Sequence, residues 1–149
     1  MSETKYGTSI SRCKKLRLDV LKYCESINFH PDENTLKILS KYGDIIIGEN
    51  HILGFDSPVN SDNTEIPMII QVTKYEQSHG LPEGYLVMQR FAIGKYRPYK
   101  LIVIDKHGIL YQCQLNRGLI KPNSIKPLGA PFAGYIVKLF AEWTYKHFI

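Results

Sequence analysis

The strongest constraint on the fold is a pair of apolar, β-branched segments separated by a short polar turn. Lys100–Ile104 and Ile109–Cys113 are rich in residues that favour strands, and Asp105–Gly108 between them has the composition of a turn. Tyr85–Met88 is a third segment of this kind. Together the three segments predict an antiparallel meander.

Helical periodicity lies on both sides of this meander. Between Arg12 and Asn28, apolar residues recur at steps of three and four, which predicts an amphipathic helix. From Pro131 onward the same spacing predicts a C-terminal helix packed on the sheet. We expect burial of six side chains on these faces and in the strands: Leu16, Val20, Leu39, Val103, Phe140 and Trp143.

The segments in between are shorter. Pro31–Gly43 predicts a second helix, because proline and two acids stand at its start and Gly43 is placed to end it. Two short strands are expected at Ile45–Ile47 and Ile52–Phe55, and an irregular connection at Leu115–Ala130. A third helix that contains Pro67 is expected, with Asp62 or Thr64 as its cap and its end near Ser78 or Gly80. Helices at the start, middle and end of an antiparallel sheet define an α+β class.

Length and composition indicate one domain over residues 1–149, with residues 1–10 flexible. The chain has 44% hydrophobic and 22% charged residues, as globular proteins do. No run approaches the length of a membrane span, and the first ten residues lack the apolar stretch of a secretory signal. We therefore expect a cytoplasmic protein that does not associate with membranes.

Motifs for catalysis and metal binding are absent from the sequence. Cys13, Cys24 and Cys113 have no C-x-x-C spacing, and the five histidines form no pair at i and i+4. The glycines of Gly80–Gly84 are not followed by the Lys-Ser/Thr ending of a phosphate loop. We therefore predict buried cysteines, no metal, no cofactor and no enzymatic activity.

Charge is unevenly distributed along the chain. Residues 1–94 hold ten basic and twelve acidic residues, a net of −2, whereas residues 95–149 hold nine basic and two acidic residues, a net of +7. A basic half attracts nucleic acid, an anionic membrane or an acidic protein surface. Charge alone does not distinguish these partners.

One segment, Arg90–Lys100, interleaves cationic and aromatic side chains. This mixture suits protein contacts, because Tyr and Arg are enriched in interface hot spots, and it also suits phosphate contacts with base stacking. A solvated hairpin loop is the third interpretation. The candidate partner-binding residues are Arg90, Lys95, Tyr96, Arg97, Tyr99 and Lys100.

Three local patterns, taken in order, resemble the SUKH superfamily, which includes Syd-like and Knr-like proteins and many bacterial immunity proteins. Leu36–Gly43 is similar to a family helix that ends in a Phe-Leu pair, a short gap and an aromatic residue or Asn before glycine. Gly80–Met88 is similar to the Leu-Pro turn that leads into a central strand. Ile104–Tyr111 is similar to two strands joined by an Asp-x-x-Gly turn. His30-Pro31 departs from the family, because a Leu-Pro pair usually opens the second helix.

The resemblance implies a SUKH-like α+β fold and a non-catalytic role in bacterial competition. Members of this kind are immunity proteins that bind and neutralise a cognate toxin domain. The basic C-terminal half differs from the acidic balance of members that neutralise nucleases, and it implies a toxin with an acidic surface. The alternative is a nucleic-acid-binding or regulatory interaction module that uses residues 90–100.

Overall fold

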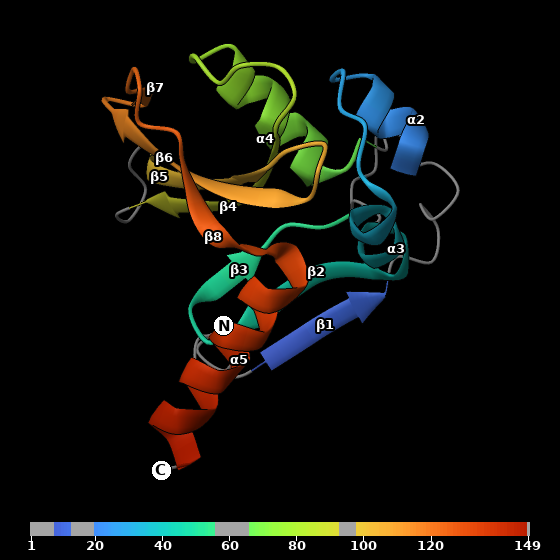
Figure 1. Cartoon of the computed structure of the whole chain (residues 1–149), viewed down its shortest axis with the longest axis vertical. Helices are drawn as coiled ribbons and strands as arrows, with labels where there is room; N and C mark the ends of the chain where they lie inside the picture. Colours follow the sequence, from blue (N-terminus) through green and yellow to red (C-terminus); the bar gives the residue numbers. More distant parts are fainter. Residues whose placement is uncertain (1–7, 13–19, 56–65, 93–97, 149) are drawn as a thin grey trace.

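The computed structural model of the 149-residue chain describes residues 8–12, 20–55, 66–92 and 98–148. Helices and antiparallel sheets make up this part of the chain (Figure 1), which confirms the α+β class. The helices are α2 Val20–Glu25, α3 Glu33–Lys41, α4 Met68–Gln77 and α5 Phe132–Phe148.

The strands form a smaller and a larger sheet. The smaller sheet has the order β1-β2-β3, with β1 Thr8–Arg12, β2 Tyr42–Ile47 and β3 Asn50–Ile52. The larger sheet contains the predicted meander, since β4, β5 and β6 are successive antiparallel neighbours. Its strands are β4 Leu86–Ala92, β5 Pro98–Ile104, β6 Ile109–Asn116, β7 Leu119–Ile120 and β8 Lys126–Pro131.

The N-terminal region differs from the sequence prediction. Thr8–Ile10, expected to be flexible, belong to β1 and pair with β2. Arg12, expected to begin a helix, also lies in β1. The described helix is confined to Val20–Glu25, and residues 13–19, with the predicted core residue Leu16 and with Cys13, lie outside the described part of the chain.

Helix α3 begins as predicted but ends differently. The Asp32 carboxylate caps it by accepting a hydrogen bond from the Thr35 backbone N–H at 3.2 Å. Tyr42 already has the extended backbone of β2, at φ −115° and ψ 144°, so Gly43 is a strand residue and not a helix terminator. Glycine is required at position 54 because the two backbones approach closely. A Cβ on Gly54 would lie 2.3 Å from the Gly43 carbonyl oxygen.

The predicted irregular connection Leu115–Ala130 contains two strands. Arg117 and Gly118 have φ values of +55° and +80° and form a two-residue turn between β6 and β7. Strand β8 pairs with the outer side of β6. Pro127 and Pro131 are accommodated because an edge strand has N–H positions that need no ladder partner. The prediction of an irregular connection is therefore wrong for Lys126–Pro131, because an edge strand tolerates proline.

Helix α4 covers one face of the larger sheet. Pro67 occupies its N-cap position without a side-chain cap, in place of the expected Asp62 or Thr64, which lie outside the described residues. The Thr73 hydroxyl donates to the Ile69 carbonyl at 2.8 Å and accepts from the Val87 N–H at 3.0 Å, which ties the helix to β4. The cluster between them contains Val72, Leu81, Val87, Leu101, Val103 and Cys113.

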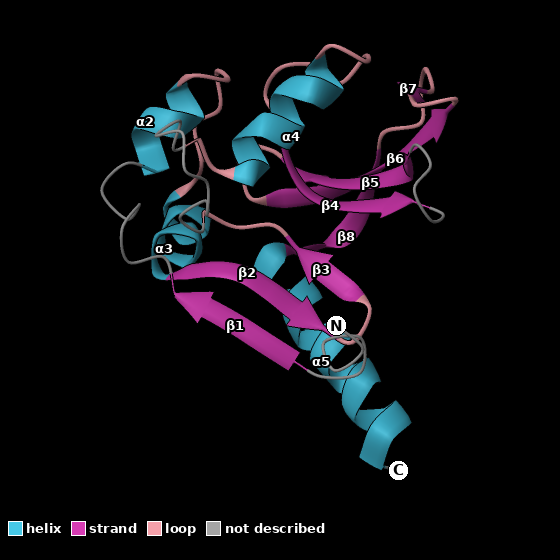
Figure 2. Ribbon diagram, turned by 180° about the vertical axis from the view of Figure 1, so that it is seen from behind, coloured by secondary structure: helices cyan, strands magenta, loops and turns pink. Residues whose placement is uncertain are grey.

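The larger sheet lies between α4 and the smaller sheet (Figure 2). On the second face Gln89 is almost fully buried, donates to Asn50 at 2.9 Å and accepts from the Tyr135 hydroxyl at 2.7 Å. These bonds join β4 to β3 and to α5. Helix α5 then extends beyond the sheets at its C-terminal end (Figure 1; Figure 2).

Five of the six predicted core side chains lie in the described part of the chain, so their burial can be compared with the prediction. Val20, Leu39 and Val103 are buried, as predicted. Phe140 is only partly buried, and so is Trp143. The reason is that α5 contacts the body mainly through its first half, where Phe132 and Leu139 are buried. The helical spacing predicted the helix correctly, but it does not show how much of the helix packs against the rest of the protein.

Candidate functional site

The candidate residues that the structure describes lie at the ends of β4 and β5. Arg90 belongs to β4, whereas Tyr99 and Lys100 belong to β5. Tyr99 was expected in a turn, but it is a strand residue with 47% of its surface exposed. Lys95, Tyr96 and Arg97 lie outside the described residues.

The two described cations lie on opposite faces of the sheet. Lys100 pairs with Phe91 across the strands, its Nζ is 4.2 Å from the Phe91 ring centroid, and Phe91 packs against the core shared with the smaller sheet. Arg90 pairs with Leu101, which belongs to the cluster under α4. Arg90 and Lys100 therefore do not form one continuous basic stripe.

An irregularity in β4 explains why Arg90 faces α4. Val87 pairs with Val103 and Gln89 pairs with Ile102, so the register shifts by one residue at Met88. Simple alternation from Val87 would place Arg90 on the opposite face. The bulge turns Met88 and Gln89 to that opposite face and brings Arg90 back to the side of α4.

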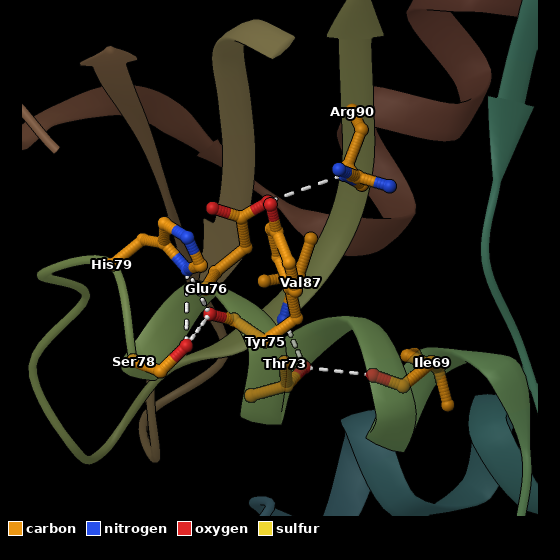
Figure 3. A network of polar contacts seen from close by, with 8 residues as sticks. All are labelled: Ile69, Thr73, Tyr75, Glu76, Ser78, His79, Val87 and Arg90. Atoms are coloured by element: carbon orange, nitrogen blue, oxygen red, sulfur yellow. Dashed lines mark hydrogen bonds and ion pairs between the residues drawn. The ribbon is translucent and has the colours of Figure 1, made fainter. Parts of the chain in front are cut away.

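Arg90 meets a buried carboxylate of α4 (Figure 3). Its Nε lies 3.3 Å from Oε2 of Glu76, whose side chain is 0% exposed, whereas the Arg90 side chain is 36% exposed. The guanidinium carbon also lies 5.8 Å from the Tyr75 ring centroid. The Glu76 carboxylate and the Tyr75 ring therefore both contact the Arg90 side chain and restrict its position.

Glu76 is the most unusual polar group in the described structure. Neither of its carboxylate oxygens accepts a hydrogen bond of normal geometry from a described group, and the Arg90 contact is an ion pair. Burial raises the pKa of Glu76, and the charges of Arg90 and His79, together with the polar contact to the Arg90 side chain, offset only part of this effect. A buried carboxylate without hydrogen bonds is unfavourable for folding.

Tyr75 and His79 form the rim beside this pair. Their rings stack at a centroid distance of 4.1 Å and an interplanar angle of 24°. His79 Nδ1 is 2.8 Å from the Tyr75 carbonyl oxygen and 3.0 Å from the Ser78 hydroxyl, which fixes the imidazole ring. Tyr75 is nevertheless 49% exposed. We call Tyr75, His79 and Arg90, with Glu76 beneath them, the α4–β4 surface (Figure 3).

The sequence prediction included Arg90 but missed Tyr75 and Glu76 of α4 and His79, which follows the helix. A signal was present, because Ile69, Val72, Thr73 and Glu76 follow helical spacing and place a carboxylate on the buried face of α4. An acid in an apolar stripe indicates a buried charge that needs a partner. Its partner could not be read from the sequence, since the bulge in β4 decides which side Arg90 faces.

The described residues contain no group of three or more His, Cys, Asp or Glu side chains that could hold a metal ion. Burial raises the pKa of Cys24 to about 12, and burial together with the charge of Glu76 raises that of Cys113 to about 11. Both thiols are therefore neutral and buried, which is unsuitable for a nucleophile. Cys13 lies outside the described residues.

No family model matches the chain, and no curated protein sequence matches it. In the described part of the chain, no helix combines the length and apolar character that a membrane span needs.

Proposed function

We propose that this chain is a cytoplasmic, non-catalytic binding protein, and more specifically an immunity protein that binds and neutralises a cognate toxin domain. The observation that carries the proposal is the exposure of Tyr75 on α4, beside the partly exposed Arg90, and of Tyr99 on β5. Tyr and Arg are the residue types that dominate interface hot spots. A folded scaffold with such side chains on its surface is suited to a protein partner.

The resemblance to the SUKH superfamily supports the immunity role. Its three motifs lie at element boundaries of this chain: Leu36–Gly43 spans the end of α3 and the start of β2, Gly80–Met88 connects α4 to β4, and Ile104–Tyr111 contains the β5–β6 turn. Tyr42 and Gly43 of the first motif begin β2 and do not end a helix, which departs from the resemblance.

Charge supports an acidic partner. The basic half of the chain places exposed lysines on the β5–β6 turn, after β7 and on α5: Lys106, Lys121 and Lys138. Such charges accelerate association with an acidic surface and contribute less to affinity. Arg90 and Tyr99 then supply the short-range contacts.

Nucleic-acid binding is the alternative, and the net charge of +7 in residues 95–149 favours it. A nucleic acid is best served by cations that follow one track along its backbone. The location of Arg90 and Lys100 on opposite faces of the sheet is less suited to such a track than to separate protein contacts.

The experiment co-expresses the chain with the protein encoded beside its gene and measures survival of the host cell. Calorimetry at physiological salt then compares binding of that protein with binding of single-stranded RNA and duplex DNA. We expect protection and tight protein binding, and only weak, steeply salt-dependent binding of nucleic acid.

Two sets of variants locate the interface. Replacing Tyr96, Arg97 and Tyr99 with alanine should weaken protection, whereas the matched replacement of the exposed Val137 and Tyr145 on α5 should not. Undiminished protection in the first set places the interface elsewhere. If RNA or DNA binds more tightly than any encoded neighbour, the immunity role is wrong.

A further inference from the structure

The Glu76–Arg90 pair is poorly explained as a stabilising ion pair. Glu76 is fully buried and gains no good hydrogen bond from the described residues, while Arg90 stays partly in solvent. Desolvation of a buried charge commonly exceeds the attraction to its partner, so an apolar or amide side chain would serve folding as well. The pair does, however, restrict where the Arg90 guanidinium can lie.

We propose that Glu76 positions Arg90 as the anchor for one carboxylate side chain of the partner protein, with the Tyr75–His79 stack as the wall of the site. This inference rests on the proposed function and specifies the chemistry that the α4–β4 surface recognises. Arg90 has five N–H donors, and its contact with Glu76 is made through Nε. Figure 3 shows part of the guanidinium directed away from Glu76, where it can meet a second carboxylate.

Pre-organisation is the physical advantage of this arrangement. A free arginine loses rotamer entropy when it binds, whereas Arg90 is already restricted by Glu76 and by the Tyr75 ring. The His79 ring is itself fixed by the Tyr75 carbonyl and by Ser78. A partner carboxylate therefore meets a guanidinium and an aromatic wall that need little rearrangement.

The occupant is a protein carboxylate and not a nucleic acid for an electrostatic reason. Glu76 and Arg90 together are neutral, so their field at a distance is weak and their attraction to an anion is short-ranged. Nucleic-acid binding depends on accumulated positive charge and release of counterions. The neutral Glu76–Arg90 pair, with exposed N–H donors on the guanidinium, suits hydrogen bonding to a single, well-placed Asp or Glu.

The first test requires no natural partner. Side-chain NMR follows the Arg90 Nε–H signal of the full chain during titration with a capped peptide, acetyl-Gly-Asp-Glu-Asp-Gly-amide, and with its Asn/Gln counterpart. We expect the acidic peptide alone to shift the signals of Arg90, Tyr75 and His79. A uniform effect on the lysines of the basic half, or equal shifts from a short RNA at the same concentration, would overturn the proposal.

The second test separates positioning from folding. Glu76→Gln should leave the protein folded with unchanged or greater stability, broaden the Arg90 Nε–H signal and weaken binding of the acidic peptide. Arg90→Lys keeps the positive charge but loses the planar guanidinium and its paired N–H donors, so we expect the same weakening of peptide binding. Lys121→Ala removes one exposed charge elsewhere and should leave the peptide shifts at Arg90 in place. Unaltered peptide binding in Glu76→Gln shows that Glu76 does not position Arg90 and overturns the proposal.

The third test uses the toxin partner. Arg90→Ala should reduce its affinity by about 30-fold, which is typical of a hot-spot residue. Full affinity in that variant would overturn the anchor while leaving the immunity function intact. If no protein partner binds but the acidic peptide still shifts Arg90, the proposed function fails and the carboxylate site stands.

Discussion

Glu76 on α4 and Asp105 in the β5–β6 turn are two carboxylates beside the larger sheet whose surroundings are opposite. Asp105, in the β5–β6 turn, accepts hydrogen bonds from the backbone N–H groups of His107 and Ile109 and from the Tyr111 hydroxyl, at 2.8, 3.0 and 2.8 Å. Glu76, buried under the α4–β4 surface, accepts none of normal geometry from the described residues. The two groups have opposite pKa shifts as a result.

Burial would raise the pKa of Asp105, but its hydrogen bonds from Ile109, Tyr111 and His107 outweigh burial and lower it. For Glu76 burial dominates and the pKa is raised, despite the nearby charge of Arg90. Asp105 therefore stabilises the β5–β6 turn. The buried carboxylate of Glu76 is unfavourable for folding but restricts the position of the Arg90 guanidinium. Stability and binding should therefore respond to the two residues in different ways.

The largest effect is expected at Asp105. Asp105→Ala removes the acceptor of three hydrogen bonds and should lower the free energy of unfolding by about 3 kcal/mol, at roughly 1 kcal/mol for each bond. Urea denaturation measures this change. Tyr111→Phe removes one of the bonds and should lose about a third as much. Equal stability of wild type and Asp105→Ala would show that the turn forms without its carboxylate.

Arg90 should come next, although it lies at the surface. Arg90→Ala leaves Glu76 buried without its cation, which should destabilise the protein by about 2 kcal/mol at neutral pH. Truncation of an ordinary surface residue changes stability by about 0.5 kcal/mol or less. Lys121→Ala provides that comparison in the same denaturation experiment. A loss at Arg90 no larger than at Lys121 would contradict the ion pair.

Removing the other member of the pair should have a smaller effect of opposite sign. Glu76→Gln leaves Arg90 free to be solvated and eliminates a buried charge, so stability should stay within about 1 kcal/mol of wild type and favour the variant. The double variant Glu76→Gln, Arg90→Ala should regain most of the stability lost in Arg90→Ala. A strong loss in Glu76→Gln would show that the carboxylate is needed for folding.

The smallest effect is the pH dependence, and its sign distinguishes the two carboxylates. The native pKa of Glu76 lies above the ordinary value of 4.5, so its contribution to stability falls as pH rises from 4.5 through the native pKa. The native pKa of Asp105 lies below 3.8, so its contribution is lost as pH falls from 3.8 through the native pKa. Unfolding free energies of wild type, Glu76→Gln and Asp105→Asn across acidic pH measure both trends. Parallel curves for wild type and Glu76→Gln would contradict the raised pKa.

Local patterns in the sequence determined much of this fold. Two runs of strand-favouring residues on either side of Asp105–Gly108 predicted the β5–β6 hairpin, and steps of three and four predicted α5, because both signals arise from neighbours along the chain. The Asp-x-x-Gly turn also contained its own stabilising acceptor. These features depend on few long-range contacts, so the sequence alone revealed them.

Tertiary structure decided the candidate site. A bulge at Met88 shifts the register of β4 by one residue, and this shift places Arg90 over Glu76 and separates it from Lys100. Alternation along a strand cannot predict such a shift, because the bulge is fixed by pairing with β5 and by the bonds of Gln89 to Asn50 and Tyr135. The sequence supplied the residues of the α4–β4 surface, but packing between distant elements determined that a buried carboxylate and an exposed guanidinium would meet.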